Sequence, residues 1–589
     1  MFIGEIKADL KKITGEDVSL EHPADLSHGD YSTNIALVLA KKEKRNPGEL
    51  ADEIVKKWRE TGLPGFVEKI EAAGVGFLNI WLKFDALGNQ TAEVLKEADS
   101  FGKTEIFKNK TFLLEHTSPN TNKSLHVGHV RNNVTGMAIS RILEFNGAKV
   151  IKDCLFNDRG IHICKAMWGY LRKNTNYKGK GWKEILDRWF EHQDEWPKPE
   201  DEGEKPDHFV EKFYGLGVNA EEDEGNKREI QEILLAWEDN DEKVRALWKK
   251  LNDWVYQGFE ETFRELGSRY DHGWYESGFY QQAKETVKEG LEKGVFKRLD
   301  GGAILTNLEA MGLTDTIVQR ADGTSMYFTQ DIYLTKQKTE KFPADKYIWV
   351  VGPEQQLHLK QVFAVCEQLG IGKREFFLHL WYGFVYLKGK GKMSSRRGTV
   401  ISADELLLEA RRLSLPLIKE ETIFSKEEKE KISAAVGTGA VKYGLLKLGR
   451  TQDIYFDWEE SLSLKGNSGP YLQYTYARTQ SVLTKSQIQN SKFQINPNFQ
   501  NSNFSNEEIS LLRIIYRFPE VVREAAENYS PNLVCNFLYD LAQKFNLFYD
   551  KQRIIGSENE DFRLVLTAAV GQVLKNGLTL LGIEPLNRM

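Results

Sequence analysis

The sequence predicts an α/β protein built around a Rossmann-type core, in which a doubly wound parallel sheet carries the functional site. Two stretches that alternate strand and helix patterns support this prediction, one from Thr111 to Cys154 and one from Lys346 to Leu387. Parallel strands joined by helices place their loops at the carboxyl edge of the sheet, where doubly wound folds bind ligands. The 589 residues leave room for further domains, because one domain usually spans roughly 150 residues.

The first stretch begins with the apolar run Thr111 to Glu115, which is typical of a buried strand. A loop rich in Ser, Pro and Asn leads to His126, and apolar residues then recur at every fourth position from Val130 to Ile142. This spacing predicts a helix, and Gly147 lies where a helix end favours a residue that can adopt positive φ. The segment from Ala148 to Cys154 is the second predicted strand.

The second stretch repeats the pattern. It contains a strand from Lys346 to Val351, a helix from about Gln355 to Leu369 that Gly370 stops, and an apolar segment from Phe376 to Leu387. Between the two stretches, residues 170–290 are rich in Trp, Glu and Lys. They predict a mainly helical insertion, to which we assign no chemistry.

Two domains are expected to flank the core, which we place at residues 106–405. Residues 1–105 combine an amphipathic helix pattern, as in Glu49 to Glu60, with the strand-like run Gly76 to Leu82. They predict a small α+β N-terminal domain. Residues 406–589 are helical in pattern almost throughout and predict an all-α C-terminal domain.

Bulk composition narrows the function classes. The chain is 41% hydrophobic and 28% charged, as in an ordinary globular protein, and its net charge of −6 neither supports nor excludes a nucleic-acid partner. Four scattered cysteines suit neither a disulfide framework nor a zinc knuckle, so we expect a reducing compartment and no structural metal. The start of the chain resembles no signal peptide and no apolar run could span a membrane, so we expect a cytoplasmic protein.

A pair of histidines marks the start of the first predicted helix. His126 and His129 are three residues apart, which puts both on one face beside the unpaired amides of the helix, a favourable phosphate site. Gly128 leaves room for a ligand to approach the backbone, and the imidazoles could neutralise charge that develops on phosphate oxygens. Four residues alone leave ordinary surface histidines as the simpler interpretation.

A glycine-rich basic segment is the second phosphate-directed feature. It runs from Lys388 to Gly398 with five cations, and no acidic residue occurs between Phe376 and Ala403. Such a segment could close over a triphosphate and supply positive charge where pyrophosphate leaves. In isolation it could equally be a solvated surface loop. No P-loop sequence occurs in the chain.

Together, the two features resemble the HIGH and KMSKS signatures of class I aminoacyl-tRNA synthetases. His126-Val127-Gly128-His129 corresponds to the first, and Lys392-Met393-Ser394-Ser395 to the second. Ser395 stands where KMSKS has its second lysine. We hypothesise that Lys123, three residues before His126, supplies the missing cation.

Motifs over nearly the whole chain resemble the arginyl-tRNA synthetases within that class. They are Ser118-Pro119-Asn120, Asp322 to Tyr327 and Val350 to His358 in the core, Gly29 to Asn34 in the N-terminal domain, and Gly466 to Tyr474 in the C-terminal domain. The resemblance implies that the N-terminal domain binds the elbow of tRNA. It also implies an anticodon-binding part that begins at about residue 465.

The resemblance carries site residues over by position. The implied catalytic residues are His126, His129 and Lys392. The implied ATP-binding residues are Lys123, His126, Gly128, His129, Lys392, Met393, Ser394 and Ser395. The implied arginine-binding residues are Glu115, Asn120, His126, Tyr327, Asp331 and Gln355. The implied tRNA-binding residues are Phe77, Asn79, Tyr471, Gln473, Tyr474 and Arg478.

Arginine makes chemical sense of the amino-acid set. A guanidinium is best bound by carboxylates that accept paired hydrogen bonds, so Asp331 and Glu115 are its expected partners, with Tyr327 alongside. Asn120 and Gln355 would orient the α-amino and carboxylate ends. The alternatives are that Glu115 only forms a salt bridge and that Asp331 only caps a helix. For the C-terminal aromatics, Tyr471 and Tyr474 could instead be core residues on one helix face.

The implied function is that of an arginine–tRNA ligase, which converts arginine and ATP, with Mg²⁺, to arginyl-adenylate and transfers the arginyl group to the terminal adenosine of tRNA. A monomer without membrane contact is expected, and activation is expected to require tRNA. A nucleotidyltransferase with an HxGH site is disfavoured by the basic segment and the large helical domain. A non-catalytic synthetase-like tRNA-binding protein is disfavoured because His126, His129 and Lys392 are all present. A lysyl class I enzyme stays open, since carboxylates also bind ammonium.

Overall fold

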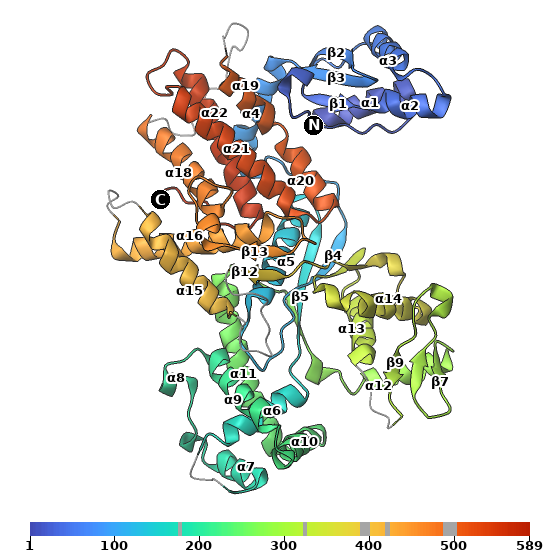
Figure 1. Cartoon of the computed structure of the whole chain (residues 1–589), viewed down its shortest axis with the longest axis vertical. Coiled ribbons are helices and arrows are strands. Elements are labelled where there is room, and N and C mark those ends of the chain that lie inside the picture. The colour runs from blue at the N-terminus through green and yellow to red at the C-terminus, as the bar shows by residue number, and fades with distance from the viewer. Residues whose placement is uncertain (175–178, 322–326, 389–400, 419–423, 487–503) are drawn as a thin grey trace. The chain divides into compact units, whose positions relative to one another are not determined.

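The computed structural model describes the chain except for residues 175–178, 322–326, 389–400, 419–423 and 487–503. It contains two compact units (Figure 1). One consists of Met1–Ile106 together with Ser463–Met589, and the other of Phe107–Leu462. The first unit therefore joins the two ends of the sequence, and the second contains the predicted core.

Five parallel strands form the central sheet of the second unit, in the order β11-β10-β4-β5-β6. Their bounds are Thr111–Glu115 for β4, Lys149–Phe156 for β5, His272–Tyr275 for β6, Lys346–Trp349 for β10 and Phe377–His379 for β11. From β4 the chain proceeds to β5 on one side, and it later returns at β10 on the other. This reversal beside β4 is the topological switch point at which doubly wound folds bind ligands.

Helices connect the strands as the sequence predicts. α5 (Val127–Phe145) joins β4 to β5, and α14 (Gln356–Leu369) joins β10 to β11. Gly147 and Gly370 both adopt positive φ, 89° and 79°, where these helices end. Leu113 of β4 lies in one hydrophobic cluster with Ile332 of α13 (Tyr327–Lys341) and Val362 of α14, so α13 and α14 cover the sheet. The predicted doubly wound parallel core is confirmed.

The insertion between β5 and β6 is helical, as predicted. Its helices are α6 (Ile161–Leu171), α7 (Trp182–Glu191), α8 (Pro199–Glu202), α9 (Pro206–Ala220), α10 (Glu224–Glu238) and α11 (Glu242–Glu265). α6 packs on both α9 and α10, and α9 packs on α11. Buried aromatic rings, including Trp189, Phe209 and Phe213, fill the spaces between them.

A small antiparallel sheet between β6 and α13 is absent from the sequence-based expectations. It consists of β7 (Phe296–Arg298), β8 (Ile304–Thr306) and β9 (Ile317–Gln319), and it follows α12 (Ala283–Glu292). Strands of three residues are too short to show a period of two, which explains why the pattern did not reveal them.

The compact second unit continues past the predicted boundary at residues 405/406. α15 (Ala403–Ser414) and α16 (Lys426–Leu446) pack on each other and on α5. The apolar run 376–387 divides between two sheets, because β12 (Val385–Leu387) pairs with β13 (Ile454–Phe456) instead of extending β11. The short helix α17 (Trp458–Ser461) ends the unit.

The first unit has an α+β part and a helical part. In the α+β part, helices α1 (Phe2–Thr14), α2 (Ile35–Glu43) and α3 (Pro47–Thr61) accompany the antiparallel strands β1 (Tyr31–Thr33), β3 (Phe77–Leu82) and β2 (Val67–Ala73). The helical part contains α4 (Phe84–Glu97), α18 (Gly469–Lys485), α19 (Asn506–Ile515), α20 (Phe518–Glu527), α21 (Pro531–Lys551) and α22 (Glu560–Leu580). Both predicted fold types are confirmed.

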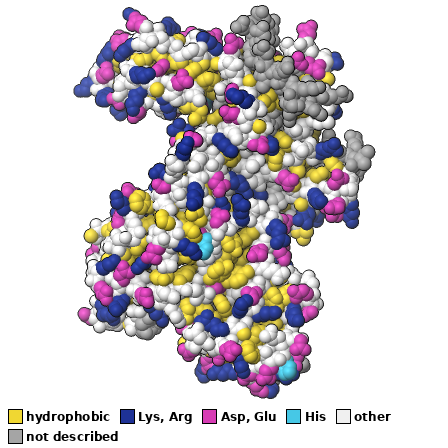
Figure 2. Space-filling view, turned by 180° about the vertical axis from the view of Figure 1, so that it is seen from behind, with side chains coloured by type: hydrophobic (Ala, Val, Ile, Leu, Met, Phe, Trp, Pro, Cys, Tyr) yellow, Lys and Arg dark blue, Asp and Glu magenta, His cyan; other side chains and the backbone are white. Residues whose placement is uncertain are grey.

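The surface mixes charges of both signs. On the face shown in Figure 2, Lys and Arg side chains are interspersed with Asp and Glu over most of the area, in keeping with the small net charge. Among the described residues, no helix is long and apolar enough to cross a membrane.

Candidate active site

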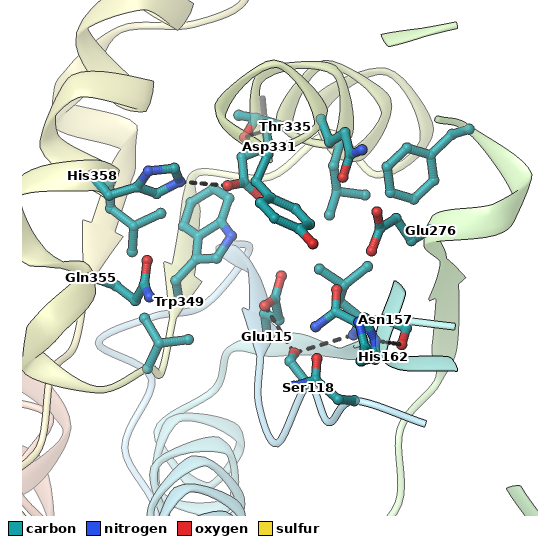
Figure 3. Close-up of a pocket in the computed structure, with 18 residues that line it drawn as sticks. Glu115, Ser118, Asn157, His162, Glu276, Asp331, Thr335, Trp349, Gln355 and His358 are labelled. Atoms are coloured by element: carbon teal, nitrogen blue, oxygen red, sulfur yellow. Dashed lines mark hydrogen bonds and ion pairs between the residues drawn. The ribbon is translucent and has the colours of Figure 1, made fainter. Parts of the chain in front are cut away.

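A pocket of about 420 Å³ opens at the carboxyl ends of β4, β5 and β10 (Figure 3). This volume is in the range of small-molecule sites. Five of the six residues predicted to bind the amino acid line it: Glu115, Asn120, Tyr327, Asp331 and Gln355. His126, the sixth, is not among the lining residues. The fold therefore brings together residues that lie up to 240 positions apart in the sequence, 355 − 115 = 240.

Four of the five predicted residues lie at or within about one turn of an element end. Glu115 is the last residue of β4, Tyr327 is the first residue of α13 with Asp331 one turn later, and Gln355 directly precedes α14. Figure 3 shows Asp331 and His358 together on one side of the pocket and Glu276 on another. Side chains from several rigid elements thus converge on one space.

Both predicted carboxylates, Asp331 and Glu115, already have partners in the structure. His358 Nε2 lies 2.5 Å from Asp331 Oδ2, and Ser118 Oγ donates to Glu115 Oε1 at 2.9 Å. Lys338 Nζ donates to Glu115 Oε2 at 2.5 Å. Glu115 therefore forms the ion pair of the alternative interpretation, while its contact to arginine stays a prediction. The alternative that Asp331 caps a helix is wrong, because α13 begins four residues earlier, at Tyr327.

A third carboxylate, Glu276, lines the pocket and was not predicted. It is 3% exposed, and its Oε1 has no hydrogen-bond partner among the described residues. Burial raises the pKa of the Glu276 carboxyl to about 7, against the opposing charge of Arg159, whose nearest nitrogen lies 3.7 Å away. No signal in the sequence identified Glu276, because it lies in the stretch 170–290 that the pattern predicts as mainly helical, and the four residues of β6 are too few to show a period of two.

The loop that leaves β4 is strained. Thr117 has φ 72° and Ser118 φ 42°, a region that costs non-glycine residues on the order of 1–3 kcal/mol each. Asn132 of α5 holds this conformation, because its Oδ1 accepts the Thr117 N–H at 2.5 Å and its Nδ2 donates to the Val350 carbonyl at 2.6 Å. The conformation places Ser118 at the pocket wall.

The two signature histidines cap the helix that they begin. His126 is the N-cap residue of α5, and its Nδ1 accepts the Gly128 N–H at 3.1 Å. His129 Nδ1 accepts the His126 N–H at 3.1 Å, and the two rings stack with centroids 3.8 Å apart. The expectation of unpaired backbone amides is therefore wrong at these two positions, because the histidine side chains bind them.

Burial keeps both histidines neutral. Desolvation lowers the pKa of His126 to about 4 and that of His129 well below its ordinary value, and the charge of Lys123 lowers both further. Because each Nδ1 accepts from the backbone, a neutral ring must carry its proton on Nε2. The histidines therefore offer Nε2–H donors, and their action on charge that develops on phosphate oxygens stays a prediction.

The basic segment lies mostly outside the described residues, and so do the predicted Lys392, Met393, Ser394 and Ser395. The chain that follows is described and pairs with the histidine motif. Val127 N–H donates to the Ile401 carbonyl at 3.2 Å, and Ala403 N–H donates to the Leu125 carbonyl at 2.7 Å. The described chain that follows the basic segment is thus hydrogen-bonded beside the histidine motif.

Lys123 lies in the same region, since its charge acts on both histidines. Burial lowers the pKa of its ammonium, and the nearby Glu211 carboxylate opposes this shift. Its role as the substitute for the lysine missing at Ser395 stays a prediction.

The predicted tRNA contacts of the N-terminal domain differ in accessibility. Phe77, at the start of β3, is 39% exposed. Asn79 is buried, and its Oδ1 accepts a hydrogen bond from Ser32 Oγ at 2.8 Å. Phe77 is therefore the member of this pair that a partner could reach directly.

The predicted contacts on α18 divide in the same way. Gln473 is fully buried and donates to the Glu584 carbonyl at 2.9 Å, and Tyr471 is buried with its hydroxyl 3.0 Å from Asn546 Nδ2. Tyr474 and Arg478 are half-buried, with the guanidinium 5.0 Å from the ring centroid. The core interpretation is correct for Tyr471, whereas Tyr474 and Arg478 are accessible.

One group of metal-ligating side chains occurs among the described residues, away from the pocket: Asp207, His208 and Asp404. Lys205 Nζ donates to both Asp404 carboxylate oxygens at 2.8 Å, and His208 Nε2 lies 2.7 Å from Asp404 Oδ2. The Lys205 ammonium thus already supplies the positive charge that a metal ion would bring to Asp404.

Family models match nearly the whole chain. The model described as "tRNA synthetases class I (R), catalytic domain" matches residues 90–458. That of the "Arginyl tRNA synthetase N terminal domain" matches residues 2–82, and that of the "DALR anticodon binding domain" matches residues 472–589.

Individual proteins show the same similarity. The arginine–tRNA ligase of Phocaeicola vulgatus is 36% identical over 98% of this chain and 96% of its own length. That of Bacteroides fragilis is 36% identical over 100% of this chain and 99% of its own length. The structure of the Thermus thermophilus arginyl-tRNA synthetase superposes with a TM-score of 0.80 at 25% identity, covering 100% of both chains.

Proposed function

This chain belongs to the arginyl-tRNA synthetase family of class I, and on that premise we propose how its pocket serves an arginine–tRNA ligase. The enzyme activates arginine with ATP and transfers it to tRNA. The observation that supports an arginine site is the convergence of three carboxylates, Glu115, Glu276 and Asp331, from three separate elements on one pocket. A guanidinium is permanently charged and presents five donors in a plane, so it suits several carboxylates better than one.

We assign the guanidinium to Asp331 and Glu276, with the Tyr327 hydroxyl alongside. Glu276 is buried and keeps one oxygen without a hydrogen-bond partner among the described residues, so an incoming donor would satisfy it. Glu115, bonded to Ser118 and Lys338, is assigned to the α-ammonium instead. This differs from the sequence-based prediction, because Lys338 already occupies one oxygen of Glu115. Asn120 and Gln355 orient the α-amino and carboxylate ends.

The histidine motif is assigned to ATP, which enters as its Mg²⁺ complex. The arginine carboxylate attacks the α-phosphorus and pyrophosphate leaves, which gives arginyl-adenylate. A ribose hydroxyl of the terminal adenosine of tRNA then attacks the arginyl carbonyl and releases AMP. His126 and His129 donate Nε2–H bonds to phosphate oxygens, and Lys392 stabilises the leaving pyrophosphate, so catalysis rests on placed donors and charges without a covalent enzyme intermediate.

The elbow and the anticodon of the tRNA are both assigned to the first compact unit. We propose that residues 1–105 contact the elbow, with Phe77 accessible, and that the helical part from about residue 465 binds the anticodon through Tyr474 and Arg478. We further propose a monomer, as expected from the sequence, and a reducing cytoplasm, supported by four buried free cysteines.

Charging assays with each of the twenty amino acids and total tRNA test the proposal. We expect esterification of tRNA with arginine alone, and no ATP–pyrophosphate exchange in the absence of tRNA. Charging with lysine at a comparable kcat/KM would contradict the arginine assignment. A protein that binds tRNA but charges no amino acid would contradict catalysis.

A further inference from the structure

A buried lysine lies directly behind the pocket and is shared by two carboxylates. Lys338 of α13 is 1% exposed, and its Nζ lies 2.5 Å from Glu115 Oε2 and 2.6 Å from Asp153 Oδ2. Glu115 lines the pocket, whereas Lys338 and Asp153 do not. Burying an ammonium costs several kcal/mol unless partners compensate it closely, and two carboxylates do so here.

Further hydrogen bonds fix both carboxylates. Trp274 Nε1 donates to Asp153 Oδ2 at 2.7 Å, and Ser118 Oγ donates to Glu115 Oε1 at 2.9 Å. Two carboxylates and one ammonium leave the group with a net charge of −1. Asp153 is fully buried and does not line the pocket. A cation in the pocket can therefore contact this negatively charged group only at Glu115.

We propose that Lys338 is a positioning residue for arginine: it fixes the Glu115 carboxylate at the base of the pocket and, through its sharing with Asp153, leaves that carboxylate able to bind the α-ammonium. This inference rests on the proposed arginine site. Asp331 and Lys338 are seven residues apart on α13, which places them on one helix face. In the proposed site, α13 therefore carries both Asp331, which contacts arginine directly, and Lys338, which supports the second contact through Glu115.

The ionisation of the group follows from its surroundings. Burial lowers the pKa of Lys338, but Asp153 and Glu115 outweigh it, so the net pKa shift is upward and the ammonium persists. Burial raises the pKa of Asp153, which Lys338 opposes. Among the described residues, the charge of Lys338 also acts on the titratable groups His272 and Cys154. Removal of the ammonium would leave two adjacent buried carboxylates, one of which would keep a proton to higher pH.

The test compares Lys338→Met with Lys338→Arg and with Lys341→Met, an exposed lysine on the same helix. We expect Lys338→Met to raise the KM for arginine about tenfold or more, with the KM for ATP changed less than about twofold. The defect relative to the parent should be larger at pH 6 than at pH 8.5. Lys338→Arg should restore most of the binding, and Lys341→Met should match the parent.

Asp153→Asn provides a second variant that keeps the ammonium. It leaves Lys338 to neutralise Glu115 alone, so we expect a several-fold higher KM for arginine without loss of folding. If Lys338→Met and Asp153→Asn both fold and bind arginine like the parent in calorimetry, Lys338 is only structural and the inference is overturned. The inference is overturned likewise if the KM values for arginine and ATP rise together in these variants. A parent enzyme that fails to bind arginine would instead overturn the proposed function.

Discussion

The side chains of His126 and His129 both accept hydrogen bonds from the backbone at the start of α5. The His126 N–H donates to His129 Nδ1 at 3.1 Å, and the Gly128 N–H donates to His126 Nδ1. The same side chains that hold the helix start in shape therefore keep their Nε2–H groups as donors for a ligand. In the proposed mechanism, folding and catalysis use different nitrogens of the same rings, so substitutions can separate the two roles.

His126→Asn should keep the fold and lose activity. The Asn oxygen can replace Nδ1 as the acceptor for Gly128, so the free energy of unfolding should change by less than about 1 kcal/mol. No group replaces the Nε2–H donor, so adenylate formation should fall about a hundredfold. Urea unfolding and tRNA-dependent pyrophosphate exchange measure the two effects. A large loss of stability together with the activity would refute this separation.

His116 should make the fold sensitive to acid. Its ring is buried, and desolvation lowers its pKa from 6.5 to about 4. Between these values the unfolded chain binds the proton and the folded one does not, so stability falls as pH drops from 6.5 to 4, by roughly 3 kcal/mol for this group. Urea unfolding at pH 7.5, 6 and 5 should give a shallower pH dependence for His116→Gln than for the parent. Equal slopes would count against this prediction.

Glu276 should make arginine binding depend on pH. Its pKa of about 7 means that the carboxyl is mostly protonated at pH 6 and mostly ionised at pH 8. A guanidinium binds the ionised form, so kcat/KM for arginine should rise across this range, by up to about tenfold per pH unit below the pKa. Glu276→Gln should remove this rise and weaken binding at pH 8. An unchanged profile in the variant would exclude Glu276 as the titrating group.

Asp331→Asn should weaken arginine binding strongly. The neutral Asn amide cannot neutralise the charge of a guanidinium, and its NH₂ group would face the N–H donors of the guanidinium. The KM for arginine should therefore rise about a hundredfold. Glu340→Gln, an exposed change on the same helix, is the matched control and should match the parent. An unchanged KM for arginine in Asp331→Asn would remove this residue from the site.

Tyr474→Ala should affect tRNA alone. Its half-buried ring lies beside the Arg478 guanidinium on α18 and could stack on an unpaired base. Stacking on an aromatic side chain contributes about 1–3 kcal/mol per base, so the KM for tRNA should rise at least severalfold while the KM for arginine stays constant. Lys485→Ala, at the end of the same helix, serves as the control. Equal effects of both changes would point to general electrostatics.

Local pattern alone was sufficient for the main elements of the core, and it singled out the histidine pair and the basic segment as phosphate-directed features. The strand at 111–115, the helix after His126 and the helix stop at Gly147 follow from periodicity and glycine chemistry, which depend on neighbours in the sequence. Glu115 and Asp331 were carried over by resemblance to a family, and carboxylate chemistry made them the expected partners of a guanidinium. Resemblance to a family supplied the identity of the ligand.

Only the tertiary structure decided which groups meet. Lys338 contacts Glu115 across 223 residues, and Glu276 enters the same pocket from a strand that no pattern linked to it. The neutral state of the histidines also needed the fold, since it depends on how much water burial removes. Charge and hydrogen-bond state are set by surroundings in space, whereas the sequence determines only which groups are available to be placed there.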